Sequence, residues 1–96
     1  MKKTYEFSAK LWKDPKANWY FVSLTNKLTN EIKNNHAPRI NKYGFVKVQA
    51  RTGNTKWDST LFPAKSGNYV LAIKSSVRIK EKIRDGDNLG IKIEVT

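Results

Sequence analysis

The sequence contains no cysteine, one histidine and only eight acidic residues among 96. Without cysteine the chain can form neither a disulfide framework nor a thiolate metal site, so packing alone must hold the fold together. His36 is the single histidine, which excludes a histidine metal cluster and leaves no second imidazole for a proton relay. These shortages argue against an enzyme, and they predict neither a cofactor nor a bound metal.

The few acidic residues also lack the spacing of a metal-binding loop. Asp85 and Asp87 flank Gly86, but the full calcium-loop pattern is missing and Asp-Gly is ordinary turn chemistry. The serines have no recognisable base, and the glycines do not build a phosphate-binding loop. We therefore expect a turn, not a site, at residues 85–87.

Long apolar runs are missing as well. No segment has the length of apolar sequence that a bilayer span requires. The basic start Met1-Lys2-Lys3 is followed by charged residues where a signal peptide needs an apolar stretch. The hydrophobic residues, 39% of the chain, are nevertheless strongly patterned, so we expect residues 1–96 to form one folded domain. We expect it to be soluble and cytoplasmic, with no membrane contact.

Positive charge is present in excess, with nineteen Lys and Arg giving a net charge of +11. Residues 39–56 carry five basic side chains and no acidic one, and residues 74–84 carry five against Glu81 alone. A basic surface indicates an anionic partner such as nucleic acid or another polyanion. It is also typical of a lysine-rich surface that maintains solubility and protects sheet edges. The charge alone leaves both interpretations open.

Most of the chain alternates apolar and polar residues, as half-buried strands do. Alternation covers residues 3–12, and an aromatic and β-branched run at 19–24 predicts a second strand that pairs with the first as a hairpin. Further strands are predicted at 69–73 and 89–95.

Two segments change to a helical period. One short helix is predicted at 25–34, where the hydroxyl of Thr25 can cap the first turn. A second is predicted at about 75–83, with Ser75 or Ser76 as its cap.

Gly53-Asn54 predicts a two-residue hairpin turn of type II′, because glycine accepts the positive φ of the first position. This turn fixes the register from Val46 opposite Leu61 to Arg51 opposite Lys56. One face of the hairpin is predicted to be core, and it comprises Val46, Val48, Ala50, Trp57 and Leu61. The other is predicted to face solvent, and it comprises Lys47, Gln49, Arg51, Lys56, Asp58 and Thr60.

Together these elements predict a mainly β protein. Six largely antiparallel strands and two short helices, in the order β-β-α-β-β-β-α-β, form a small barrel with no exposed edges.

Several motifs resemble the bacterial domain of unknown function 1905 family. They are Leu11-Trp12, the run Trp19-Tyr20-Phe21-Val22-Ser23-Leu24, the run from Thr55 to Pro63, Ile73-Lys74-Ser75-Ser76-Val77-Arg78 and Gly86-Asp87-Asn88-Leu89. The resemblance implies a small split β-barrel and a possible partner domain similar to bacteriocin-protection proteins. The family has no established activity, so the resemblance transfers no catalytic residue. This chain has Thr25 and Ala72 where the family pattern leads us to expect proline.

Two sets of side chains are candidates for binding. The first is basic, for anions or nucleic acid, and comprises Lys47, Arg51, Lys56, Arg78 and Lys80. The second is an aromatic platform and comprises Trp12, Trp19 and Tyr20. Exposed aromatic rings beside cations are typical of single-strand binding. Alternatively, Trp12 and Trp19 pair across their hairpin or cover the barrel end, as structural residues.

Two functions follow from these candidates. The first is a non-enzymatic β-barrel module that binds a ligand or protein partner. The alternative is a nucleic-acid-binding protein that uses the basic hairpin face without sequence preference, since lysines dominate over bidentate arginines.

Overall fold

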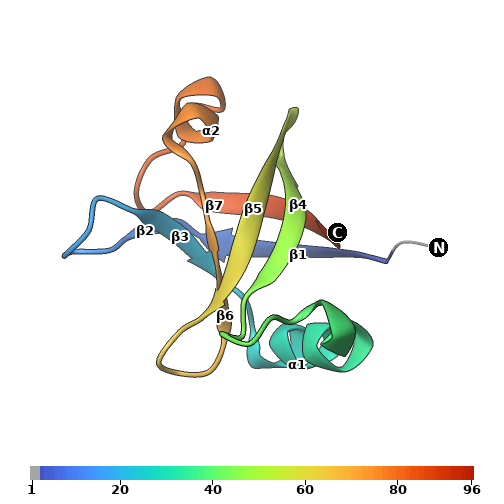
Figure 1. The fold of residues 1–96 in the computed structure, drawn as a ribbon. Coiled ribbons are helices and arrows are strands. Elements are labelled where there is room, and N and C mark those ends of the chain that lie inside the picture. The colour runs from blue at the N-terminus through green and yellow to red at the C-terminus, as the bar shows by residue number, and fades with distance from the viewer. Residues whose placement is uncertain (1–2) are drawn as a thin grey trace.

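The computed structural model describes residues 3–96 and shows a mainly β protein whose two α-helices lie at opposite ends of a curled sheet (Figure 1). The strands are β1 (Thr4–Lys10), β2 (Trp12–Lys13), β3 (Tyr20–Ser23), β4 (Val46–Thr52), β5 (Thr55–Pro63), β6 (Tyr69–Ala72) and β7 (Asn88–Val95). The helices are α1 (Asn26–Asn35), a 3-10 turn (Ala37–Arg39) and α2 (Ser75–Lys80).

The strands form one sheet in the order β1-β7-β4-β5-β6-β3-β2, with every pair antiparallel. The sheet curls into a half-barrel around the buried side chains (Figure 1). The predicted mainly β, antiparallel architecture with two helices is confirmed, with seven strands in residues 3–96 instead of six.

The seventh strand arises because the first predicted strand is divided at Leu11. The N–H of Leu11 donates to the Asp87 carbonyl at 2.8 Å, and its own carbonyl accepts from the Gly86 N–H at 2.8 Å. Both backbone groups therefore leave the ladder at this residue. The expected hairpin between 3–12 and 19–24 is wrong for its larger part, because β1 pairs with β7 and only β2 pairs with β3.

The β4–β5 hairpin has the predicted register throughout, including Val46 opposite Leu61 and Arg51 opposite Lys56. Gly53 has φ +56°, while Lys82 is the sole non-glycine residue with positive φ in the described chain. Asn54 therefore has negative φ, which is the type II′ combination and not type I′. The predicted core face is buried, and the predicted solvent face is exposed except for the half-buried Thr60.

Trp57 belongs to the buried core cluster and is 7% exposed. Its indole N–H donates to the Ala72 carbonyl at 3.3 Å, so the ring packs against apolar neighbours while its one polar group is satisfied. Ser59 donates to the same carbonyl at 3.0 Å. The interpretation of Trp57 as a core residue is confirmed.

Helix α1 begins as predicted, because the Thr25 hydroxyl accepts a hydrogen bond from the Leu28 N–H at 3.1 Å. It packs through Ile32 and through Thr29, whose buried hydroxyl accepts from the Tyr69 N–H at 3.1 Å. Neither helix in residues 3–96 has the length and apolar character that crossing a membrane would need.

Helix α2 differs from the prediction at both ends. Its N-cap is Lys74, with no side-chain capping bond, so neither Ser75 nor Ser76 has the expected role. It ends at Lys80 because Lys82 has φ +55°, and the Ile83 N–H returns to the Arg78 carbonyl at 2.9 Å. This is the Schellman geometry, in which glycine normally occupies the left-handed position that Lys82 holds here.

We expect Lys82→Gly to stabilise the protein by about 0.5–1 kcal/mol, because glycine removes the steric cost of the left-handed conformation while adding some unfolded-state entropy. Urea unfolding of the two proteins measures the difference. Lys80→Gly is the matched control within α2, and there glycine should cost up to about 1 kcal/mol. Destabilisation by both variants would show that Lys82 carries no strain.

Replacing Trp57 by alanine should cost about 3–5 kcal/mol of unfolding free energy, as large-to-small core aromatic substitutions do. Ile79→Ala is the control, because Ile79 is 78% exposed and should change stability by less than about 0.5 kcal/mol. A loss below about 1 kcal/mol for Trp57→Ala would contradict the core assignment.

Candidate functional site

The outer face of the sheet, which points away from the core, carries the basic side chains predicted on the hairpin. Arg51 on β4 lies opposite Lys56 on β5 and, on its other side, opposite Lys92 on β7. Three cations therefore occupy one row across three strands, an arrangement that mildly destabilises a sheet. Sequence reasoning missed Lys92, because the pairing of β4 with β7 joins distant segments.

Carboxylates accompany this row. Glu6 lies 3.6 Å from the Lys92 ammonium, and in the next row Gln49 lies between Asp58 and Glu94. Opposite charges thus occupy neighbouring rows of the same face, and the net positive charge there is small. Lys47, at the other end of β4, lies opposite the uncharged Thr60.

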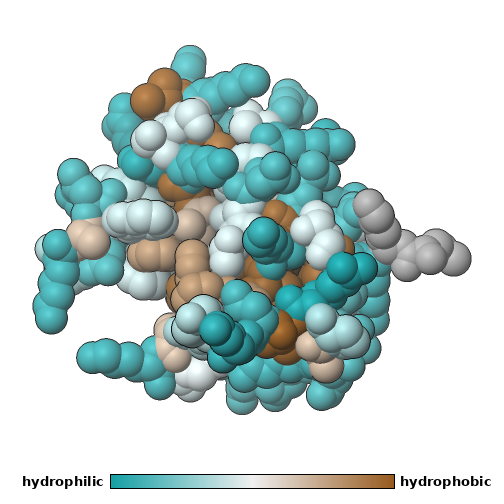
Figure 2. Space-filling model, viewed as in Figure 1, coloured by the Kyte–Doolittle hydropathy of each residue, from teal (hydrophilic) through white to brown (hydrophobic). Residues whose placement is uncertain are grey.

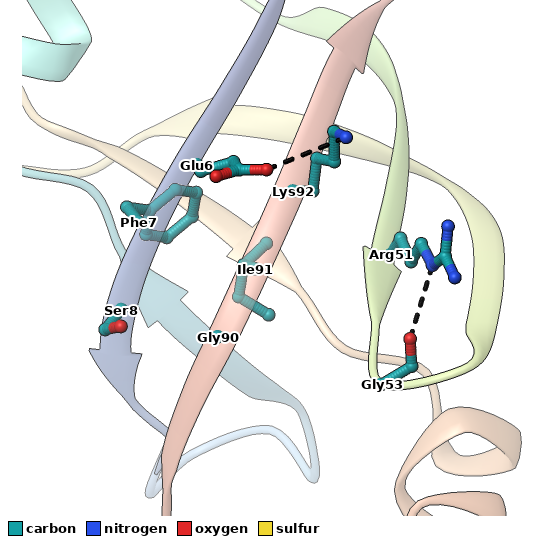
Figure 3. A pocket seen from close by; sticks show the side chains of 8 residues that line it. All are labelled: Glu6, Phe7, Ser8, Arg51, Gly53, Gly90, Ile91 and Lys92. Carbon is teal, nitrogen blue, oxygen red and sulfur yellow. Dashed lines mark hydrogen bonds and ion pairs between the residues drawn. The ribbon is translucent and has the colours of Figure 1, made fainter.

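A shallow hollow of about 570 Å³ crosses this outer face over β1, β7 and β4. Figure 3 shows Lys92 reaching toward Glu6, while the Arg51 side chain bends back to the hairpin turn. There Arg51 Nε donates to the Gly53 carbonyl at 3.2 Å. Both cations of the hollow are therefore engaged by groups of the protein itself.

Helix α2 does not join the outer face. The buried Thr55 hydroxyl, on the inner side of the hairpin, donates to the Glu81 carboxylate at 2.6 Å. This bond attaches α2 to the side of the hairpin opposite to Arg51 and Lys56. Lys80 is exposed in the last turn of α2. The structure therefore does not bring Arg78 and Lys80 together with the hairpin cations.

Arg78 instead lies over an aromatic ring of the other candidate set. Its guanidinium carbon is 3.8 Å from the centroid of Tyr20, in stacking contact. The Arg78 Nε is buried and has no acceptor among the described residues. The stacking contact holds the half-buried Arg78 side chain in the pocket wall, where its positive charge attracts an anion.

A cavity of about 370 Å³, which we call the Tyr20 pocket, opens at this contact between β3, the end of β6 and the start of α2. The Ile73 N–H donates to the Tyr20 carbonyl at 2.9 Å and so fixes β3 against the segment that leads into α2. The pocket is lined by Asn18, Trp19, Tyr20, Ala72, Ile73, Lys74, Ser75, Ser76 and Arg78.

The charged residues that line the Tyr20 pocket are of one sign. Lys74 and Arg78 line it, no Asp or Glu does, and the Lys13 ammonium lies 5.8 Å from the Tyr20 ring centroid. Ser75 and Ser76 contribute exposed hydroxyls that the helix cap does not use. Sequence reasoning missed Lys13, Lys74 and both serines as site residues. The pairing of β2 with β3 brings Lys13 to Tyr20, whereas the contact of the segment leading into α2 with β3 brings the other three.

The two tryptophans of the aromatic platform lie on the outer side of β2 and β3. Trp19 is 55% exposed and Trp12 is 36% exposed. Their rings do not pair across the hairpin, which was one of the two structural alternatives. Each packs instead on Phe21, with centroid distances of 6.2 Å for Trp19 and 5.1 Å for Trp12. The Trp12 N–H also donates to the Ser23 hydroxyl at 2.9 Å. The platform is thus partly structural and partly open to solvent.

The comparison with protein families agrees with the motifs. A family model described as "Domain of unknown function (DUF1905)" matches residues 7–93. The chain belongs to the DUF1905 family. No curated protein matches the sequence. Every residue that lines the Tyr20 pocket lies inside the matched range, so this DUF1905 domain itself builds the pocket.

His36 in this DUF1905 protein is a structural residue. It is half-buried at the end of α1, where its Nε2 lies 3.0 Å from the Tyr5 hydroxyl. The Asn35 amide donates to the same hydroxyl at 3.1 Å. The Tyr5 hydroxyl therefore accepts from Asn35 and shares a hydrogen bond with His36 Nε2. Burial, with smaller effects of Lys3 and Arg39, lowers the pKa of His36 below its ordinary value.

The lowered pKa makes stability depend on pH in a defined direction. Because the unfolded chain binds a proton more readily than the fold, the contribution of His36 is fully present above its ordinary pKa of 6.5 and is lost as the pH falls through the folded pKa. The only imidazole of the chain gives one titration curve by NMR, whose midpoint we expect below 6.5. A midpoint at or above that value would contradict the assignment. His36→Gln should remove this part of the pH dependence.

Proposed function

We propose that this DUF1905 protein is a non-enzymatic binding module that takes an anionic ligand with a planar ring into the Tyr20 pocket. One observation carries the proposal. One pocket brings together a basic candidate, Arg78, and two aromatic candidates, Trp19 and Tyr20, although Arg78 lies far from the other two in the sequence. No carboxylate lines this pocket.

The residues that line the pocket favour a ligand with two parts, a planar ring and an anionic group. A planar ring stacks on the exposed indole of Trp19. A phosphate or carboxylate on that ring lies near Lys74, the serine hydroxyls and the charge of the Arg78 side chain. The volume of about 370 Å³ suits a small molecule, since ligand pockets range from about 300 to 1,000 Å³.

The outer face of the hairpin supports binding less well. Its cations are balanced by Glu6, Asp58 and Glu94, and Arg51 and Lys92 are already engaged within the protein. A polyanion on that face would meet repulsion from the carboxylates as well as attraction from the cations.

Calorimetric titration with thymidine monophosphate (dTMP) tests the proposal, with thymidine and inorganic phosphate as probes of the two halves of the ligand. We expect dTMP to bind more tightly than either half. Lys74→Gln and Trp19→Ala should each weaken dTMP binding about tenfold, by loss of a charged contact and of a stacking surface respectively.

Lys80→Gln is the matched control, because it removes the same charge from the same helix outside the pocket. It should leave the affinity for dTMP within about twofold. Equal weakening by Lys74→Gln and Lys80→Gln would mean that the net charge attracts the anion without a site. Absence of dTMP binding by the wild type would also overturn the proposal.

A further inference from the structure

The aromatic surface of the Tyr20 pocket does not end at the pocket. Trp19 in its wall is followed on the outer side of the sheet by Phe21 and then by Trp12, with centroid distances of 6.2 Å and 5.1 Å between successive rings. Figure 2 shows residues of intermediate to hydrophobic character, coloured white to tan, gathered over β2 and β3 and bordered by hydrophilic ones. One small ligand in the pocket reaches only the first of these rings.

The ring series is held in place by the fold. Trp12 and Phe21 are directly opposite residues of β2 and β3, and the Trp12 N–H is fixed by Ser23 at 2.9 Å. Because successive residues of a strand point to opposite sides, Lys13 and Tyr20 face the pocket side while Trp12 and Phe21 face outward. A row of rings and a group of cations thus lie on the two sides of one strand pair. Because β2 is an edge strand of the sheet, a flexible ligand that passes over this edge can reach both sides.

From this juxtaposition we infer that the ligand of the Tyr20 pocket is one nucleotide of a single-stranded nucleic acid, whose neighbouring base stacks on Trp12. Rows of aromatic rings beside a positively charged groove are what sequence-tolerant single-strand binders use. The phosphates lie along Lys13, Lys74 and Arg78, around Tyr20. A duplex is excluded from this mode because its bases are already paired and stacked within the helix.

The inference rests on the proposed function, and a comparison of dTMP with a short oligo-dT strand separates the two. Fluorescence anisotropy of a labelled strand gives its affinity, and competition gives the affinity of dTMP and of an unlabelled duplex. We expect oligo-dT to bind at least tenfold more tightly than dTMP at low salt, and more tightly than the duplex.

Substitution of the two tryptophans gives the decisive pattern. Trp19→Ala should weaken the binding of both ligands. Trp12→Ala should weaken the binding of oligo-dT about fivefold or more and leave the affinity for dTMP unchanged. Tyr43→Ala is the matched control, since Tyr43 is an exposed ring outside the pocket that contacts Phe45 and Lys42. It should change neither affinity.

A second variant avoids any loss of packing at Trp12. Lys13 is exposed, so Lys13→Gln should leave the fold intact and lower the salt slope of oligo-dT binding by about one unit. Arg51→Gln on the outer face of the hairpin should not change that slope.

The outcomes distinguish the two levels of the proposal. Failure of the wild type to bind dTMP overturns the pocket itself. Binding of dTMP with no gain for oligo-dT, or an unchanged slope in Lys13→Gln, overturns the single-strand inference alone. If Arg51→Gln weakened oligo-dT binding and Lys13→Gln did not, the nucleic acid would lie on the hairpin face. That result would overturn the inference as well.

Discussion

The bend at Leu11 is the constraint on which the rest of the structure depends. The two edge strands of the sheet, β1 and β2, are consecutive in the chain and separated by this residue alone. Leu11 is fully buried, and its N–H and carbonyl are both bonded to the turn at Gly86 and Asp87. The chain can therefore leave one ladder and enter another without leaving a backbone group unpaired. One continuous segment therefore forms both edge strands of the half-barrel.

The bend at Leu11 also positions the strands that form the Tyr20 pocket. Because β2 pairs with β3, Trp12 is placed beside Phe21 and Lys13 beside Tyr20. Because β3 in turn pairs with β6, Tyr20 lies next to the segment that begins α2. Arg78 then reaches the Tyr20 ring from the helix. The same pairings that complete the sheet thus gather the rings and cations of the pocket.

The distribution of acidic residues, more than the number of basic ones, separates the two candidate surfaces. The net charge of +11 places lysines and arginines on much of the chain. On the outer face, Glu6, Asp58 and Glu94 lie among the cations, whereas no carboxylate lines the Tyr20 pocket. Asp87 is used in its own turn, where it accepts from the Arg84 N–H at 2.8 Å. A local excess of charge therefore develops at the pocket, although the hairpin face has the more regular row of cations.

The sequence by itself determined the features that depend on few neighbouring residues. Gly53-Asn54 set the register of β4 and β5, alternation placed Trp57 in the core, and the Thr25 hydroxyl began α1. Only the tertiary structure decided which distant segments meet. Adjacency in sequence favoured β3 as the partner of residues 3–12, yet β1 pairs with β7. Lys92 beside Arg51 and Arg78 over Tyr20 follow from the same long-range choices. A turn or a cap is specified by local backbone geometry, whereas the pairing of remote strands depends on burying the whole core at once.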